Sequence, residues 1–318
     1  MHLKNKQILV IDIGDYYLKG LIILFKELSL EVISGTRVLT QGFMSHITDK
    51  EKFTKSLIDL LDEIDYDNSE VIITLSSCTL NFKCLKNSLI VSDCLITEKH
   101  KMTLITEQKH DDFVLYNNQN FFLDKLLVNP INLMGKLLEL QSHVFTTNYT
   151  TILNILNCFS QLNLKVLHIS TIGAMQQIVN YKNYILVDGG CNNTRVIIKY
   201  QNEISFYQIG LGLNHLYKVT NPSLSFLTKN ANVEYTRNFF YNLGDSIVKL
   251  DKTNINLPII ITGSFIDIYY LDSFWQLNFD RECIFLNMPF ELNEMNSNYF
   301  SSIYGTAFHW HKNGCPII

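Results

Sequence analysis

Apolar residues near the start of the chain form two short runs, Ile8–Ile11 and Leu21–Leu24, on either side of a polar stretch that contains Gly14. Both runs are rich in isoleucine, whose branched side chain favours extended backbone. Two such runs joined by a short turn with a glycine are typical of a β-hairpin. The pattern therefore predicts that the chain opens with two antiparallel strands.

A third strand, a helix and a fourth strand are predicted next. Looser alternation indicates a strand over Leu30–Thr40. Thr48 and Glu51 have the spacing of a capping box, in which both side chains satisfy N–H groups at the start of a helix. The apolar residues of this helix share one face: Phe53, Leu57, Leu60, Leu61 and Ile64. The apolar run Glu70–Leu75 then gives a buried strand, and the order becomes β-β-β-α-β.

The second half of the chain repeats this pattern. Asn183–Lys199 again holds two apolar runs around a turn, here with Asp188, and Glu203–Ile209 adds a third strand. A further apolar run begins at Leu257. An internal repeat of a β-β-β-α-β unit indicates a duplicated α/β fold.

Apolar periodicity also predicts the elements between and after these repeats. Helices are expected over Thr151–Leu162 and Val233–Leu250, with a short one near Ser223–Leu227. A strand is expected over Leu164–Ile169, and Gly173 begins another helix. These elements complete two α/β halves.

Residues 81–143 differ in character from both halves. The segment is polar and rich in lysine, with short strands predicted at Leu89–Val91 and Phe113–Tyr116 and a short helix at Thr97–Leu104. It ends in a Pro/Gly turn over Asn129–Gly135 and a strand that continues to Val144. The composition indicates an inserted module.

Composition and charge limit the classes of function that this chain can have. The chain has 318 residues, of which 47% are hydrophobic and 18% charged, so it can bury a large core. A net charge of −4 without a basic stripe gives no electrostatic case for nucleic acid. The seven cysteines form no CxxC pair, which argues against a zinc site and favours reduced buried thiols.

No apolar run approaches the roughly 20 residues that span a bilayer, and the start of the chain lacks a signal-peptide pattern, so a cytoplasmic protein is expected. Histidines dispersed along the chain are expected to be structural: His46, His143, His168, His215 and His309.

The first hairpin carries the candidate chemistry. Asp12 supplies a carboxylate, Gly14 permits close approach of a ligand to the backbone, and Lys19 supplies a positive charge. This arrangement resembles the first phosphate hairpin of the actin-like ATPases, written D-x-G-(S/T)-x-x-x-K. A purely structural hairpin, with a turn that needs glycine, is the alternative interpretation.

The rest of the chain resembles one branch of that superfamily, the bacterial cell-division protein FtsA. The pattern N-P-x-x-L-x-G within Asn129–Gly135, followed by a strand ending in His143-Val144, is similar to the end of the inserted FtsA subdomain 1C. Three further segments follow in the order that the family has: a glycine turn at Gly210–Gly212, the adenosine motif at Thr262-Gly263 and the last connecting helix at Tyr304–Phe308. The pilus protein PilM is a near relative with the same type of insertion.

This resemblance implies an α/β, actin-like fold, with ribonuclease H-like duplicated β-β-β-α-β-α halves. The expected division is subdomain 1A over residues 1–80 and 144–181, an inserted 1C over 81–143, and subdomain 2A over 182–318, with 220–256 as a helical remnant in place of subdomain 2B. A near absence of 2B puts enclosure of a nucleotide and the contact with the tubulin-like FtsZ in doubt. The chain also lacks the amphipathic tail of FtsA, so membrane attachment is expected only through a partner.

The resemblance also implies nucleotide-binding residues. Asp12 and Asp188 would position Mg²⁺ and water, while Lys19 would face phosphate. The complete set implied for ATP is Asp12, Gly14, Lys19, Asp188, Gly189, Gly190, Gly212, Thr262 and Gly263. Capping of the turns is the simpler role for the two aspartates.

Three departures from the family pattern weaken this site. Asp15 replaces a hydroxyl residue and puts a second carboxylate where phosphate would lie, and like charges repel unless Mg²⁺ or a lysine intervenes. The second turn, Asp188–Asn193, lacks one glycine and the threonine. Ser264 and Phe265 replace glycine in the adenosine motif, so that Phe265 either stacks on adenine or fills its space.

The expectation is therefore an FtsA-like scaffold of the division machinery with weak or lost binding of ATP and Mg²⁺. Its partners would be FtsZ or septal membrane proteins, and itself, with recruitment to the division site at the inner membrane through those partners. A PilM-like platform for pilus assembly is the alternative within the fold. A small-molecule kinase is the alternative from another class, although no acceptor-site aspartate stands out.

Overall fold

The computed structural model describes residues 6–76, 79–127, 129–220, 233–253, 255–268, 270–292 and 295–313. The chain forms two compact units. One unit combines Met1–Cys78 with Leu156–Ile318, and the other is Thr79–Ile155.

The larger unit contains two five-stranded sheets, of which the first has the order β3-β2-β1-β4-β9. Its strands are β1 (Lys6–Ile13), β2 (Tyr17–Phe25), β3 (Leu30–Leu39), β4 (Glu70–Leu75) and β9 (Lys165–Thr171). β1, β2 and β3 pair antiparallel, as expected for a hairpin and a third strand. β4 pairs parallel with both β1 and β9, which requires crossover connections. The predicted opening order β-β-β-α-β is confirmed.

Helix α1 (Lys50–Ile64) makes the crossover between β3 and β4. Its N-cap is Asp49, whose Oδ1 accepts a hydrogen bond of 3.1 Å from Lys52 N. The predicted Thr48–Glu51 capping box is therefore wrong by one residue, because the aspartate next to Thr48 takes the cap. The apolar face was predicted correctly for Phe53, Leu57, Leu60 and Ile64, all of which are buried.

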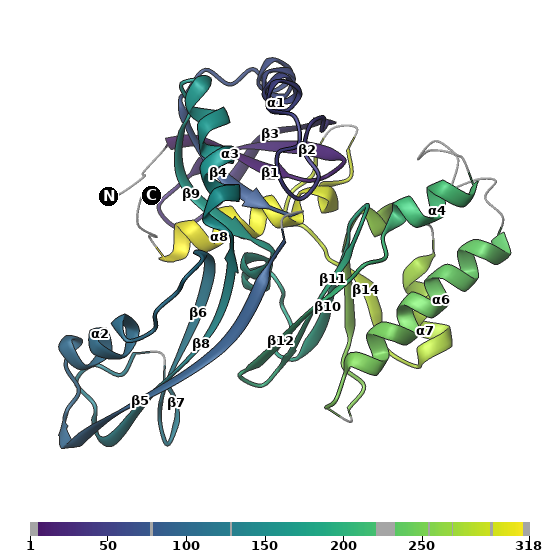
Figure 1. Ribbon diagram of the computed structural model, residues 1–318. Coiled ribbons are helices and arrows are strands. Elements are labelled where there is room, and N and C mark those ends of the chain that lie inside the picture. Colours follow the sequence, from purple (N-terminus) through teal and green to yellow (C-terminus); the bar gives the residue numbers. More distant parts are fainter. Residues whose placement is uncertain are drawn as a thin grey trace. The chain divides into compact units, whose positions relative to one another are not determined.

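Helix α8 (Ser301–Asn313) packs on the first sheet, as Figure 1 shows in yellow. Its buried residues, Ile303, Ala307 and Trp310 among them, join strand residues in one apolar cluster. The Cα of Met175 lies 2.8 Å from where a Cβ on Gly305 would be, so only glycine allows this approach. Met175 belongs to η1 (Ile172–Gln177), so the helix predicted to begin at Gly173 begins one residue earlier and is a 3-10 helix of six residues.

The second sheet has the order β12-β11-β10-β13-β14, which repeats the connectivity of the first. Its strands are β10 (Tyr184–Gly189), β11 (Thr194–Tyr200), β12 (Glu203–Ile209), β13 (Ile259–Gly263) and β14 (Cys283–Phe285). The first three again pair antiparallel, and β13 pairs parallel with β10 and β14. The predicted duplication is confirmed.

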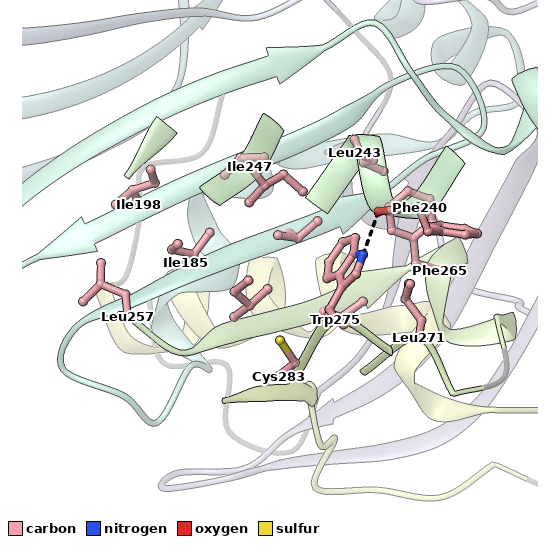
Figure 2. Packing of buried hydrophobic residues seen from close by; sticks show 14 of the residues in the cluster. Ile185, Ile198, Phe240, Leu243, Ile247, Leu257, Phe265, Leu271, Trp275 and Cys283 are labelled. Carbon is pink, nitrogen blue, oxygen red and sulfur yellow. Dashed lines mark hydrogen bonds between the residues drawn. The ribbon is translucent and has the colours of Figure 1, made fainter. Parts of the chain in front are cut away.

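Helices α4 (Leu213–Thr220), α6 (Val233–Leu250) and α7 (Leu271–Phe279) belong to this half. The predicted bounds of α6 match the structure, whereas the helix expected near Ser223–Leu227 lies outside the described residues. Figure 2 shows the core that α6 and α7 share with the sheet. At its centre the fully buried Trp275 donates its indole N–H to the carbonyl oxygen of Phe240, at 2.9 Å.

A buried ion pair fastens the end of α6 to the start of β14. Arg281 Nη1 lies 2.7 Å from Asp251 Oδ2, and the two side chains are 8% and 1% exposed. Burial alone would raise the pKa of Asp251, but hydrogen bonds from Thr253 and Arg281 outweigh it and lower this pKa. Asp251 is therefore ionised at neutral pH.

The smaller unit, Thr79–Ile155, is built on a four-stranded sheet of order β5-β8-β6-β7. Its elements are β5 (Asn81–Leu95), α2 (Glu98–Thr106), β6 (Phe113–Leu123), β7 (Lys125–Leu127) and β8 (Met134–Thr147). Its own apolar cluster consists of Val91, Ile96, Leu104, Phe121, Leu138 and Leu140. Helix α3 (Tyr149–Gln161) leads from β8 back to β9.

Candidate functional site

Two turns of the larger unit line one cavity with a volume of about 50 Å³. The first turn joins β1 to β2 and includes Gly14 and Asp15; the second joins β10 to β11 and includes Gly190 and Asn192. Because a water molecule needs roughly 10–15 Å³ on this measure, the cavity has room for about three to five waters.

The two halves place an acid and a base at equivalent positions. Asp12 pairs with Lys19 across the antiparallel strands β1 and β2. Asp188 pairs with Arg195 in the same way across β10 and β11. The strand duplication therefore places the two carboxylates near the carboxyl ends of the central strands, β1 and β10, of their sheets. Figure 1 shows the two sheets.

Asp12 is fully buried and only partly satisfied. Its Oδ2 lies 3.1 Å from Lys19 Nζ and accepts a hydrogen bond of 2.9 Å from Ser302 Oγ. Its Oδ1 has no hydrogen-bond partner among the described residues. A buried carboxylate oxygen without a donor is costly, so this atom marks a position for a water molecule or a cation.

Asp188 also lines the cavity, together with Gly263. Burial raises the pKa of Asp188; the charges of Arg195 and Lys19 oppose this rise, and that of Asp12 adds to it. Gly263 has φ +74°, and a Cβ there would lie 2.5 Å from Asp188 Oδ1. Glycine at this position is therefore required both by the backbone and by the aspartate.

The glycine N–H groups of the two turns are used within the turns themselves. Gly14 N donates to Tyr17 O at 3.1 Å, and Gly190 N donates to Asn193 O at 2.9 Å. A phosphate group is bound through N–H groups that point at it. These two N–H groups, which the resemblance assigned to nucleotide binding, already have acceptors.

Helix α4 uses the second turn as its cap. Leu213 N donates to Gly190 O at 3.2 Å, and Asn214 N donates to Cys191 O at 2.8 Å. Gly212 lies against the same turn, since a Cβ there would be 2.4 Å from Cys191 O. The turn thus supplies carbonyl acceptors to the helix.

The adenosine-type motif also faces the protein interior. Thr262 is fully buried and its hydroxyl bonds Ser301 Oγ at the start of α8. Phe265, in η2 (Ser264–Asp267), is fully buried, and its ring would lie 2.1 Å from a Cβ on Gly189. Of the two expectations for Phe265, filling space is the one that the structure bears out, because the ring belongs to the core in Figure 2.

Cys191 occupies the second turn and lines the cavity. Burial raises its pKa to about 11, although the charge of Lys19 opposes the shift. The thiol is therefore protonated at neutral pH and is unreactive as a nucleophile.

Several residues that shape the cavity were not identified from the sequence. Ser302 bonds Asp12, and Asn192 bonds Asp15. Tyr299, in η3 (Ser297–Phe300), also lines the cavity and donates its hydroxyl to Asp267. These contacts are formed through tertiary packing, so no local sequence motif predicts them.

A hydrated divalent cation fits the arrangement better than a polyphosphate does. The lining holds three carboxylates, on Asp12, Asp15 and Asp188, against the single ammonium of Lys19. The orphan Oδ1 of Asp12 and the carboxyl of Asp188 are suitable oxygen ligands for Mg²⁺. Binding of the phosphates of ATP is disfavoured by the small volume of the cavity, by its negative charge and by the glycine N–H donors that already have acceptors.

Two five-stranded sheets of the same order, with a cavity lined by matching turns of both, define the actin-like ATPase fold. Comparison with solved structures agrees with this assignment. The structure of a PilM-PilN type IV pilus biogenesis complex matches with a TM-score of 0.67 and 10% identity, covering 98% of this chain and 99% of that one. The ethanolamine utilization protein EutJ from Carboxydothermus hydrogenoformans matches with a TM-score of 0.57 and 9% identity, over 96% of this chain and 90% of that one.

Component A of (R)-2-hydroxyglutaryl-CoA dehydratase from Acidaminococcus fermentans matches with a TM-score of 0.52 and 8% identity, over 96% of this chain and 98% of that one. No family model and no curated protein sequence matches the chain. At identities this low, the similarities establish the fold and nothing narrower. Within the described residues, no helix is both long enough and apolar enough to cross a bilayer.

Proposed function

We propose that this protein is a scaffold with an actin-like fold, which acts by assembling with other proteins and in which ATP binding is weak or lost. The observation that carries the proposal is that two glycine N–H donors and the lysine of the cleft already have partners: Gly14 and Gly190 donate within their own turns, and Lys19 is paired with Asp12. A phosphoryl-transfer enzyme needs donors and cations that are free to meet the transferring group. A kinase activity is disfavoured for the same reason.

A platform of the PilM kind is the form of this function that the comparisons favour. The similar PilM structure is a complex with a second protein, PilN, and the match extends over nearly all of both chains. The unit Thr79–Ile155, with its own apolar cluster, is the proposed counterpart of the inserted subdomain, residues 81–143 in the expected division, and the proposed site of partner binding.

The FtsA-like division scaffold, which the sequence favoured, is the second candidate. Its support is the N-P-x-x-L-x-G pattern over Asn129–Gly135. Local packing accounts for part of that pattern, because a Cβ on Gly135 would lie 2.4 Å from Leu123 Cδ2. In this form of the proposal FtsZ or septal membrane proteins would be the partners, and the protein would be recruited through them to the division site.

Calorimetric titration of Mg²⁺–ATP into the purified protein tests the nucleotide part of the proposal. We expect no binding heat at millimolar ATP from protein that melts cooperatively. Micromolar binding that is lost in both Asp12→Ala and Asp188→Ala would overturn the proposal and restore the complete nucleotide set, which includes Gly189, Gly212 and Thr262. Mg²⁺ alone, titrated into the same three proteins, measures whether the two aspartates hold a cation.

Chemical crosslinking in the source cells, followed by isolation of the tagged full-length chain, distinguishes the two kinds of scaffold. Crosslinks to components of a pilus assembly support the first form, and crosslinks to FtsZ or septal membrane proteins support the second. Phosphorylation of a small metabolite by the purified protein would contradict both.

A further inference from the structure

Asp15 lies in the turn between β1 and β2 and uses both carboxylate oxygens. Its Oδ1 accepts a hydrogen bond of 2.7 Å from Ser45 N, in the loop that follows β3. Its Oδ2 accepts a hydrogen bond of 2.7 Å from Asn192 Nδ2, in the turn between β10 and β11. The carboxylate therefore connects two segments of the first half to the opposite turn of the second half.

The chain of hydrogen bonds continues into the second half. Asn192 Oδ1 accepts a hydrogen bond of 2.7 Å from Asn214 Nδ2, on helix α4. A carboxylate only accepts hydrogen bonds, so the amide nitrogen of Asn192 must face Asp15 and its oxygen is left for Asn214. The directions of the three bonds are mutually consistent, and together they fix the position of the second turn.

We propose that Asp15 is a built-in anion that holds the two turns together and decides what the cavity accepts. In a nucleotide-dependent cleft, an anionic ligand would have to bridge these turns. Here the carboxylate of the protein bridges them, so the cleft closes without a ligand and a polyphosphate meets a fixed negative charge. This inference deepens the proposed function, on which it rests, by naming the residue that makes closure independent of nucleotide.

The geometry makes this role specific to Asp15. A serine in its place would be too short to bridge Ser45 and Asn192 together, and an asparagine would lose the charge that strengthens both bonds. Asp12 and Asp188, the other carboxylates of the cavity, belong to their own sheets, where each has a basic cross-strand neighbour.

A second connection between the halves does not involve Asp15. The Arg37 guanidinium lies over the rings of both Tyr17 and Tyr299, 4.6 and 4.1 Å from their centroids. Tyr299 in turn donates its hydroxyl to Asp267, in η2 of the second half. Loss of the Asp15 carboxylate should therefore release the turns while the halves remain folded and joined.

Hydrogen exchange measured by mass spectrometry, without nucleotide, tests the inference in the full-length protein. In Asp15→Ser we expect exchange in the peptide covering residues 189–193 to become about tenfold faster or more, which is the size expected for the loss of a hydrogen bond to a charged group. Asn192→Ala removes the other partner and should give the same increase. Asp67→Ser removes an exposed negative charge from the first half and serves as the matched control, with exchange as in the wild type.

Unchanged exchange at residues 189–193 in both Asp15→Ser and Asn192→Ala would overturn the inference. Calorimetry with Mg²⁺–ATP is run on the same samples. Asp15→Ser should give binding heat at millimolar ATP, where the wild type and Asp67→Ser give none, because the fixed negative charge that repels the phosphates is gone. Absence of binding heat from Asp15→Ser as well would overturn the role in ligand exclusion. Micromolar binding by the wild type contradicts the proposed function instead, so the two failures are distinguishable.

Discussion

Acidification should destabilise the protein through two histidines, of which His309 is buried and His168 is partly buried. His168 on β9 and His309 on α8 have ring centroids 6.4 Å apart. His168 Nε2 is buried without a hydrogen-bond partner among the described residues, and His309 Nδ1 lies 2.9 Å from Asn313 Nδ2. Burial lowers the pKa of both rings to about 4, and the charge of His309 contributes at His168.

The sign and size of the effect follow from these values. An imidazole in the unfolded chain has a pKa near 6.5, so between pH 6.5 and pH 4 the unfolded state binds more protons than the folded state. The stabilisation is fully present above pH 6.5 and is lost as the pH falls toward 4. Between pH 7 and pH 5 each histidine should remove about 2 kcal/mol from the free energy of unfolding.

Urea unfolding at pH 7 and pH 5 measures this loss. In His168→Gln and in His309→Gln the difference between the two pH values should each shrink by about 2 kcal/mol relative to the wild type. His46 is exposed, so His46→Gln should leave the difference unchanged. The reasoning is refuted if the variants lose as much stability as the wild type on acidification, or if NMR titration of the two rings gives pKa values near 6.5.

Two further predictions concern the second half. Asp251→Asn should lower the free energy of unfolding by about 3 kcal/mol, because the buried Arg281 charge is left without its partner, and Arg281→Met added to Asp251→Asn should recover most of this loss. If urea unfolding shows that Asp251→Asn loses less than about 1 kcal/mol, the ion pair does not have this role. Gly263→Ala should cost about 2 kcal/mol or more, because of its positive φ and the clash with Asp188. Gly210→Ala meets no atom within 4 Å and should change stability by no more than about 0.5 kcal/mol, so equal losses at both glycines would refute the argument.

The fold was predictable because most of its elements carry their own signal. The bounds of α6 and of β4 match the apolar periodicity residue by residue, and both β-hairpins follow from Gly-containing turns between apolar runs. Elements with a weaker sequence signal were not predicted. β14 has three residues and α7 has nine, with Tyr270 and Asp280 at its ends in the left-handed region, a conformation that no apolar pattern encodes. Such elements form because the neighbouring sheet offers them a surface to cover.

The candidate site was predictable in position and less so in chemistry. Asp12 and Asp188 could be placed because each is the next-to-last residue of the first strand of a repeated unit. Asp15 was expected to repel a ligand unless a cation intervened. The structure adds that its carboxylate accepts hydrogen bonds from Ser45 and Asn192, which lie 30 and 177 residues away in the sequence. No local pattern encodes a hydrogen bond over such a separation.

The symmetry of the two halves bears on how the proposed scaffold would keep its cleft closed without a nucleotide. Duplication of the strand order puts Asp12 opposite Lys19 and Asp188 opposite Arg195, so each carboxylate has a counter-charge from its own hairpin. These pairings lie within each hairpin and do not connect one hairpin to the other. The hydrogen bond between Asp15 and Asn192, which lie in the turns of the two hairpins, provides such a connection. In the proposed scaffold this contact is made by protein groups, so closure of the cleft would be part of the folding free energy and would not depend on ligand concentration.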